Sequence, residues 1–386
     1  MRGLPKRCLF LLLVAVTAFS YPRHKVTFTY EDESAKTVHL VGTMNGWDKT
    51  STPFSKKDAK FGVTVELYPG EYEYKFLIDG EKWITDPNNE LICPGKYKNS
   101  LLIVGSEEEI EKIKGELRER AKLVTKIEEL AQGKTPFRFA VLGDNRGNPK
   151  VYKTLLEKIF SLAPNLMMNT GDLITNAGHL YQWDEFIELS SGYDFPILPV
   201  VGNHDVDNPR SEKMYRDIFV LPDEEVYYSF AYGNSQFIAL DSEIPGEESK
   251  ITGEQLEWLR VTLKENSPSN RFVFLHRPLY PDSLIGSHFG NCLDKYPEER
   301  DSLLALLKMY KVDIVFVGHE HLFRKSAHDG IIQIITGGAG APLYAAEEDG
   351  GFYHFVLVDV EEEKIKGTLY KLKDGDFIVT SIFLLE

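Results

Sequence analysis

Basic residues are in short supply in this chain of 386 residues. Lysine and arginine together number 44 against 59 aspartates and glutamates, which gives a formal net charge of −15 at pH 7. Nucleic acids and anionic membrane surfaces are bound through clusters of positive charge. The deficit therefore argues against both as partners. Small phosphate compounds remain compatible with it, because bound metal ions can supply positive charge locally.

Long apolar runs are also scarce. The one extended run, 9-LFLLLVAV-16, follows three basic residues, and Ala18 and Ser20 supply small side chains before a cleavage point after Ser20. This arrangement predicts a secretory signal peptide over residues 1–20, because an uncleaved anchor needs about 20 apolar residues. We therefore expect a secreted or periplasmic protein with no stable membrane span after signal cleavage.

Cysteine is rare as well. Beyond the predicted signal peptide only Cys93 and Cys292 remain. An oxidising compartment permits a disulfide, but the two residues are far apart and fall in different predicted domains. We expect two separate thiols, with pairing left open, and two cysteines do not by themselves make a zinc site.

Residues 25–104 have no helical periodicity. Short alternating segments separated by turns predict strands at residues 26–30, 38–42, 61–67, 72–78, 81–84 and 101–104. The dipeptide Asp79-Gly80 predicts a two-residue hairpin turn. We interpret residues 21–105 as an all-β, immunoglobulin-like sandwich.

The next segment, residues 106–134, is rich in Glu, Lys and Arg. Its apolar residues recur at gaps of three and four from Ile110 to Leu130, which is typical of one face of a helix. Ser106 is placed to cap that helix. The pattern predicts a helical linker between two domains.

Strands and helices alternate from residue 135, and the last third of the domain is mostly strand. The predicted strands are 137–142, 165–170, 197–201, 272–276, 313–317, 331–335, 353–360, 366–372 and 377–385, and the predicted helices are 150–163, 182–191, 253–266 and 300–310. This order predicts an α/β (α+β) domain over residues 135–386. We expect two packed sheets with helices on both outer faces, a four-layer αββα sandwich.

Side chains that can bind metals follow five of these strands. They are Asp144, Asp172, Asn203 with His204, His276, and His319 with His321. Any one of them has an ordinary explanation, since a strand-end Asp often caps a helix and a lone His is often only a polar residue. Five together favour a metal site, because α/β folds bind ligands at the carboxyl ends of strands. Carboxylate, imidazole and amide oxygen suit Zn, Fe, Mn or Co better than Ca.

These motifs resemble those of the calcineurin-like metallophosphoesterases, which include the purple acid phosphatases. The matching segments are 143-GD-144, 171-GD-172, 202-GNHD-205, His276 and 318-GHEH-321. The resemblance implies hydrolysis of phosphate mono- or diesters with two divalent or trivalent metal ions, of unknown identity among Mn, Zn, Fe and Co. It implies that Asp172 bridges the ions, that Asp144 and His321 hold the first, and that Asn203, His276 and His319 hold the second. His204 would protonate the leaving oxygen, with Asp205 orienting it.

Arg146 departs from the family pattern. Many members have a ligating His at this position, whereas purple acid phosphatases use a Tyr three residues after the bridging Asp, where this chain has Thr175. The first metal is therefore one ligand short, with water or Asn145 as candidates, and no purple colour is expected. A guanidinium cannot bind a cation but can bind a phosphate oxygen. We expect Arg146 to contact the substrate, with a salt bridge to a nearby carboxylate such as Asp205 as the alternative.

Other residues on loops near the motifs are candidates for lining the substrate site. Asn145, His288 and Asn291 are predicted to do so, and the run 337-GGAGAPLY-344 lies on a neighbouring loop. Aromatic residues such as Trp183 and Tyr344 are expected in the core.

The N-terminal region carries a second resemblance. The segments 39-HLVGTMNGWD-48, 69-PGEYEYKFLIDGEKWITDPNN-89 and 97-YKNSLLIV-104 resemble the glycogen-binding module of AMP-activated protein kinase β subunits. The resemblance implies α-glucan or a similar polysaccharide as a partner. It implies that Trp47 and Trp83 stack on sugar rings and that Lys75 and Asn99 bond the hydroxyls.

Two functions remain open. The first is an exported dinuclear phosphoesterase that acts on phosphate mono- or diesters and is held on α-glucan by its N-terminal module. The alternative is a glucan-binding protein with a vestigial metallophosphoesterase domain. The complete set of expected metal ligands favours the first.

Overall fold

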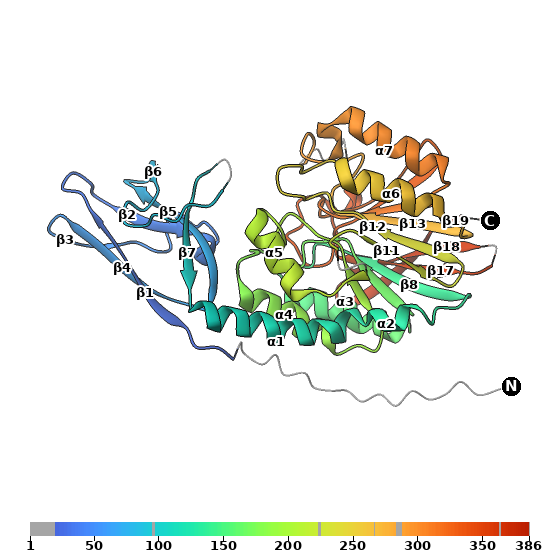
Figure 1. Cartoon of the computed structure of the whole chain (residues 1–386), viewed down its shortest axis with the longest axis horizontal. Coiled ribbons are helices and arrows are strands. Elements are labelled where there is room, and N and C mark those ends of the chain that lie inside the picture. Colours follow the sequence, from blue (N-terminus) through green and yellow to red (C-terminus); the bar gives the residue numbers. More distant parts are fainter. Residues whose placement is uncertain are drawn as a thin grey trace.

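The computed structural model describes residues 20–94, 97–222, 225–265, 267–282, 288–362 and 364–385. They form a small β-module and a larger α/β domain, and helix α1 (Glu107–Thr125) runs from one to the other (Figure 1). The predicted signal peptide lies outside the described residues, apart from Ser20. Within the described ranges no helix is long and apolar enough to cross a bilayer.

The module consists of two antiparallel sheets. One has the order β1 (His24–Glu31), β4 (Lys60–Leu67) and β3 (Ser55–Lys57); the other has β5 (Gly70–Ile78) between β2 (Val38–Gly42) on one edge and β6 (Lys82–Ile84) and β7 (Ser100–Val104) on the other. This confirms the predicted sandwich. Strand β3 was not predicted because its sequence, SKK, is fully exposed and has no apolar residue.

Side chains alternate along the central strand β5. Tyr74 and Phe76 point into the core, where Phe28 packs against both with ring centroids 4.9 and 6.4 Å away. The intervening residues lie on the outer face of the sheet. The predicted turn joins β5 to β6, and Asp79 and Gly80 both have positive φ, 49° and 77°. Because Ile78 pairs with Lys82, the connection has three residues, 79–81, one more than predicted.

Helix α1 begins where it was predicted. Ser106 Oγ accepts a hydrogen bond of 3.1 Å from the backbone N–H of Glu109. The predicted apolar stripe is buried, and it packs against α4 (Leu180–Ser191) and α5 (Pro209–Ile218) as part of the core of the large domain. The helix is interrupted at Lys126, whose φ is 41°, and the short α2 (Ile127–Leu130) follows. The segment therefore comprises two helices, and the first is an integral part of the larger domain.

The large domain contains two six-stranded sheets. The first has the order β10 (Ile197–Pro199), β9 (Leu166–Asn169), β8 (Phe137–Leu142), β17 (His354–Val360), β18 (Ile365–Lys373) and β19 (Asp376–Leu385). The second has the order β11 (Tyr228–Tyr232), β12 (Ser235–Ala239), β13 (Asn270–Leu275), β14 (Ile314–Val317), β16 (Ile331–Thr336) and β15 (Phe323–His328). Strands β8, β9 and β10 are parallel, as are β12, β13, β14 and β16.

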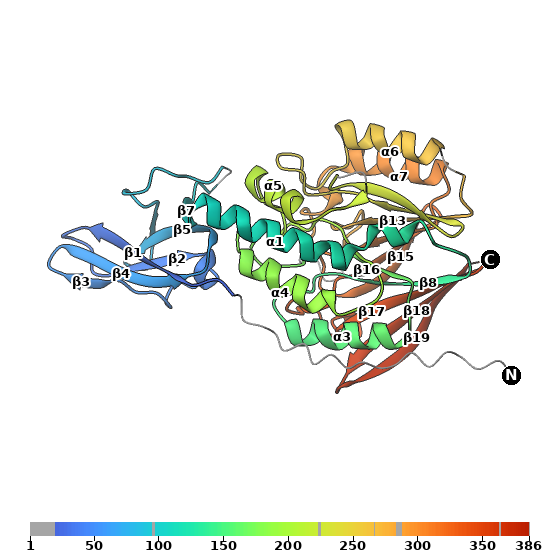
Figure 2. The same cartoon turned by 60° about the horizontal axis from the view of Figure 1, so that its bottom comes forward.

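The two sheets pack face to face and helices cover their outer faces. Phe139 of β8 contacts Phe237 and Phe272 of the second sheet, with ring centroids 5.0 and 4.9 Å apart. The adjacent Val273 points the other way, into a second core under α6 (Gly253–Glu265) and α7 (Pro297–Met309). Helices α3 (Pro149–Ser161) and α4 lie on the opposite side of the molecule (Figure 2). The predicted four-layer arrangement is therefore confirmed.

Several elements were not predicted. Helix α5 has a polar sequence, PRSEKMYRDI, with few apolar residues to mark its period. Strands β11, β12 and β15 were also missed, the last because four of its six residues are polar. Cys93 and Cys292 are both buried free thiols, as expected.

Candidate functional site

The predicted metal ligands lie in loops that directly follow parallel strands. In the first sheet, Asp144, Asp172 and Asn203 lie two, three and four residues after the ends of β8, β9 and β10. In the second sheet, His276 and His319 follow the ends of β13 and β14. The carboxyl ends of both sheets therefore supply the site. Asp144, Asp172 and His319 have φ values of 57°, 57° and 66°. Such conformations are costly for residues with a Cβ, and they cluster at functional sites.

Two glycines allow these loops to approach one another. A Cβ on Gly202 would lie 2.2 Å from the backbone nitrogen of Asp172 and 2.5 Å from its Oδ1. A Cβ on Gly318 would lie 2.5 Å from Asp144 Oδ2. Both distances are far below van der Waals contact, so any larger residue would displace the neighbouring carboxylate.

One group of donor atoms surrounds His276. Its Nε2 lies 3.1 Å from Asn203 Oδ1, 3.2 Å from His319 Nδ1 and 3.3 Å from Asp172 Oδ1. Its Nδ1 is 2.9 Å from the carbonyl oxygen of Thr170, to which it donates a hydrogen bond. That bond places the ring hydrogen on Nδ1 and leaves the lone pair of Nε2 available, which is the arrangement usual for metal-binding histidines.

A second group of donor atoms lies beside the first. Asp144, Asp172 and His321 each offer a ligand atom, and these atoms lie within 4.8 Å of one another. His321 Nε2 is 3.5 Å from Asp144 Oδ1, and its Nδ1 donates to the carbonyl oxygen of Pro342 over 2.7 Å. Asp172 is common to both groups.

Electrostatics and an unsatisfied atom at this site fit metal ions. Asp144 Oδ1 is buried without a hydrogen-bond partner, which is rare for a buried polar atom and calls for a specific partner. Burial lowers the pKa of His319 well below its usual value, so its ring is neutral, the form that binds a cation. Burial alone would raise the pKa of Asp172, but the neighbouring imidazoles and Arg146 hold it well below its usual range. Asp172 and His319 are thus in the forms that bind a cation. Burial alone would lower the pKa of His321, but its contact with Asp144 raises it.

His204 is held beside these groups by the loop after Asp172. Its Nδ1 donates to the carbonyl oxygen of Thr175 over 2.8 Å, and its backbone N–H donates to Asp172 Oδ1 over 3.0 Å. The Nε2 atom is therefore left for chemistry. Thr175 was not predicted to take part, because a backbone carbonyl leaves no signal in the side-chain pattern.

The predicted role of Asp205 is wrong. Its carboxylate accepts hydrogen bonds from the backbone N–H groups of Leu173, Ile174 and Gly202, at 2.9, 3.2 and 2.9 Å. Asp205 therefore holds two loops of the site together. The backbone carbonyl of Thr175, rather than Asp205, orients His204. Burial, with the nearby negative charge of Asp172, raises the pKa of Asp205 well above its usual value.

Arg146 forms the salt bridge to a nearby carboxylate that was the alternative to a substrate contact. Its Nε donates to Asp172 Oδ2 over 3.1 Å, and the side chain is largely buried, so the partner is Asp172 rather than Asp205. Asn145 is engaged at both ends: its Nδ2 donates to the carbonyl oxygen of Leu173 and its Oδ1 accepts from Asn169. These two bonds hold the loop in place.

A cluster beside His319 includes a residue that the sequence placed in the core. Tyr344 is 42% exposed, and its hydroxyl lies 3.0 Å from His288 Nδ1 and within hydrogen-bonding distance of the backbone of His319 and His321. The structure thus brings the predicted His288 to the site, where burial and the charge of His321 lower its pKa to about 4. Trp183, by contrast, is fully buried as expected.

Asn291 is turned toward an arginine rather than toward the metal-ligand candidates. Its backbone oxygen and its Oδ1 both accept hydrogen bonds from Arg277 Nη1. Arg277 also forms a buried ion pair of 2.7 Å with Glu243. The prediction that Asn291 lines the substrate site is therefore not supported by its contacts, which anchor the loop that carries His288.

The four carbohydrate-binding candidates lie on the module. Lys75 is on the outer face of β5, and Trp83, on β6, pairs across the sheet with Leu77 of that same face. Asn99 donates to Glu73 Oε2 over 2.7 Å, and Lys75 Nζ donates to the carbonyl oxygen of Tyr97 over 2.6 Å. Trp47 follows β2 and is 36% exposed.

Comparison with known proteins agrees with this geometry. Residues 137–323 match the family model described as calcineurin-like phosphoesterase. The chain contains a calcineurin-like metallophosphoesterase domain. Residues 24–101 match the model described as the glycogen recognition site of AMP-activated protein kinase, so the phosphoesterase domain follows a module of that type.

Individual relatives divide between the two parts of the chain. Purple acid phosphatase 23 of Arabidopsis thaliana is 29% identical over 196 residues, 47% of this chain and 39% of that protein. Protein PTST homolog 2, chloroplastic, from the same plant is 38% identical over 71 residues, 18% of this chain and 13% of that protein. The chain thus spans less than half the length of either relative.

A solved structure supports the fold. The purple acid phosphatase PPD1 from yellow lupin (Lupinus luteus) seeds superimposes with a TM-score of 0.54 and 17% sequence identity, over 94% of this chain and 69% of that one. The likeness therefore extends across both the module and the phosphoesterase domain.

Proposed function

We propose that this protein is an exported, metal-dependent hydrolase of phosphate esters with a dinuclear centre. Asp144 and His321 would hold one ion, Asn203, His276 and His319 the other, and Asp172 would be shared between them. The observation that carries this proposal is the position of Asp172, whose carboxylate belongs to both groups of donor atoms. Bound there, two ions would supply Lewis-acid charge to the phosphoryl oxygens and an activated water.

The residues of the chain itself would position the substrate and move a proton. His204, with Nδ1 bonded to Thr175, can donate from Nε2 to the oxygen that leaves phosphorus. Asp205 keeps the loops that carry His204 and Asp172 at a fixed separation. The N-terminal module would hold the enzyme on an α-glucan, a role supported by its match to a glycogen recognition site.

One observation favours a second function, glucan binding without catalysis. The guanidinium of Arg146 lies 3.1 Å from the carboxylate that would bridge the ions, where a positive charge competes with a cation. Relatives of 25–26% identity are named probable inactive purple acid phosphatases. In this alternative the module alone acts.

Activity of the secreted protein tests the proposal. Expressed in a secreting host, the chain is expected to appear in the medium with Tyr21 as its first residue, because the signal peptide predicts cleavage after Ser20. The mature protein should hydrolyse p-nitrophenyl phosphate or bis-p-nitrophenyl phosphate, lose that activity on dialysis against a chelator, and regain it with Mn²⁺ or Zn²⁺. Glycogen binding without hydrolysis of either ester under any of these metals would support the alternative and reject the enzyme.

A further inference from the structure

A cleft of about 390 Å³ lies between the module and the phosphoesterase domain. This volume falls within the roughly 300–1,000 Å³ of small-molecule binding sites. The walls come from both parts of the chain: Trp47, Glu71 and Glu73 on the module side face Thr175, Asn203 and His204 on the other. The proposed proton donor, His204, and a proposed sugar contact, Trp47, therefore line the same cleft.

The module is joined closely to the loop that positions His204. The backbone N–H of Glu71 donates to the carbonyl oxygen of Gly178 over 2.8 Å, and His179 Nε2 lies 3.1 Å from Thr43 Oγ1. Glu71 also forms an ion pair with Arg210, with Nε at 2.9 Å from Oε2. The first two contacts involve Gly178 and His179, in the same loop whose Thr175 carbonyl holds His204. The cleft is thus bounded on both sides by hydrogen-bonded segments.

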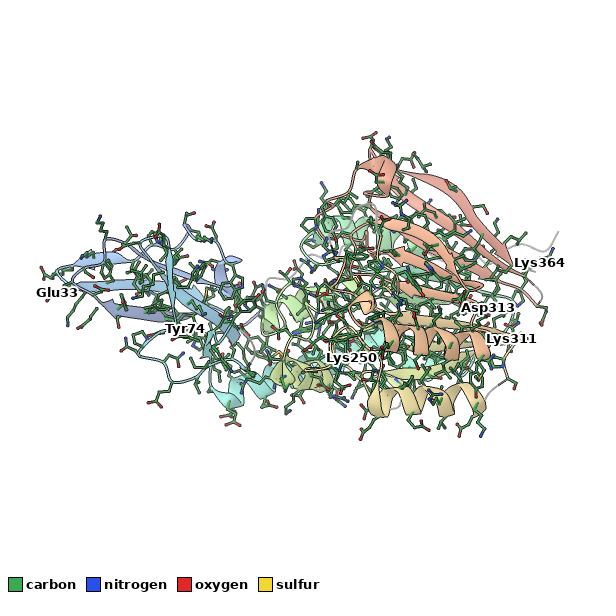
Figure 3. All side chains as sticks on the ribbon, turned by 90° about the horizontal axis from the view of Figure 1, so that it is seen from above. Glu33, Tyr74, Lys250, Lys311, Asp313 and Lys364 are labelled. Atoms are coloured by element: carbon green, nitrogen blue, oxygen red, sulfur yellow. The ribbon has the colours of Figure 1, made fainter. Side chains whose placement is uncertain are left out.

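The outer face of the module leads into this cleft. Glu71, Glu73 and Lys75 lie on that face of β5, and they span about 13 Å at about 3.3 Å per residue. Glu71 and Glu73 line the cleft, whereas Lys75 and Trp83 lie further out along the sheet. The module and the phosphoesterase domain lie end to end, with Glu33 at the far tip of the module (Figure 3). A linear sugar polymer on this face would therefore have one end directed at His204.

The backbone of Trp47 is strained at the mouth of the cleft. Its φ of 60° is unusual for a bulky residue, and its N–H donates to the carbonyl oxygen of Gly42 over 2.9 Å. Strain of this kind persists where the surrounding structure imposes it, often at ligand sites. A flat indole held in that way can stack on a pyranose ring, while the carboxylates of Glu71 and Glu73 can accept hydrogen bonds from its hydroxyls.

We propose that the substrate is an α-glucan chain carrying a phosphate monoester, with the phosphorylated sugar in the cleft against Trp47 and its phosphate at the metal-ligand candidates. The proposal rests on the phosphoesterase function proposed above. In the reaction a water oxygen bonds to phosphorus and the bond from phosphorus to the sugar oxygen breaks. The sugar oxygen takes the proton of His204, which is restored from the water, and the products are a free hydroxyl and inorganic phosphate.

Short soluble substrates distinguish a composite site, in which the module and the phosphoesterase domain bind one sugar together, from a module that only tethers the enzyme to a polymer. We would measure kcat/KM for maltotetraose 6-phosphate and for p-nitrophenyl phosphate, and take their ratio. A tether acts only on long polymers, whereas a cleft acts on a tetrasaccharide. Trp47→Ala is expected to lower the ratio at least tenfold. Trp83→Ala should weaken binding to glycogen but lower the ratio much less than Trp47→Ala, and the exposed Val379→Ala on β19 serves as the control for handling.

The outcomes distinguish the two proposals. If the wild-type protein hydrolyses p-nitrophenyl phosphate but the Trp47→Ala ratio equals that of the control variant, the composite site is wrong and the phosphoesterase stands. A wild type without activity on either compound rejects the phosphoesterase itself. If Trp47→Ala and Trp83→Ala lower kcat/KM equally on phosphorylated glycogen but not on maltotetraose 6-phosphate, the module is only a tether and the composite site is wrong.

Discussion

His204→Ala is expected to lower kcat for phenyl phosphate by about 10²–10⁴-fold, the usual contribution of a positioned general acid. Phenolate is a poor leaving group and needs the proton that His204 Nε2 supplies, since Nδ1 is committed to Thr175. The loss should be much smaller for 2,4-dinitrophenyl phosphate, whose leaving group needs no proton. Steady-state kinetics with the two esters, at equal metal content, measures the difference.

A structural role for His204 would give a different pattern. If the imidazole only braced the loop after Asp172, both esters would lose the same factor and the protein would bind less metal. His328→Ala, at the end of the edge strand β15, provides a histidine control and should leave both rates at the wild-type level.

Gly202→Ala is expected to lower metal affinity by about 10–100-fold, with a parallel loss of activity. The added Cβ would meet the backbone nitrogen of Asp172 at 2.2 Å and its carboxylate oxygen at 2.5 Å, and the first of these atoms cannot move without the backbone. One of the two loops must move, and outer contacts that orient ligands are commonly worth 10–100-fold in affinity. Titration of the apo-protein with Zn²⁺ by calorimetry provides the measurement.

The same substitution elsewhere provides the control. A Cβ on Gly115 of helix α1 meets nothing within 4 Å, and alanine favours the helix over glycine by roughly 0.5–1 kcal/mol. Gly115→Ala should therefore raise the melting temperature slightly and leave Zn²⁺ affinity unchanged. Wild-type affinity in Gly202→Ala would show that the loops of the site are not held as closely as the structure describes.

The order of strands and the polar residues at their ends could be read from the sequence because both are local features. Strand β8 was predicted at residues 137–142 and runs from Phe137 to Leu142. Asp144 and Asp172 follow strands whose apolar runs are unmistakable, and parallel neighbours bring such ends together. The positions of the metal-ligand candidates thus follow from pattern alone.

Contacts between remote segments could not be predicted in that way. The partner of Arg146 is Asp172 rather than Asp205, and His204 is held by a backbone carbonyl of Thr175, which any residue could supply. The cleft depends on how the module docks against residues 175–179, which follow Glu71 by more than 100 positions. Strand β3 was missed because it has no apolar residue, and helix α5 because it has few.

Counting the bound metal ions tests the central claim most directly. Elemental analysis of the mature protein, saturated with Mn²⁺ or Zn²⁺ and freed of excess, is expected to give two ions per chain in the wild type. Asp172→Ala, which removes the one carboxylate common to both groups of donors, should retain one ion or none. A wild type with fewer than two ions, or a variant that keeps both, would contradict the shared-carboxylate centre.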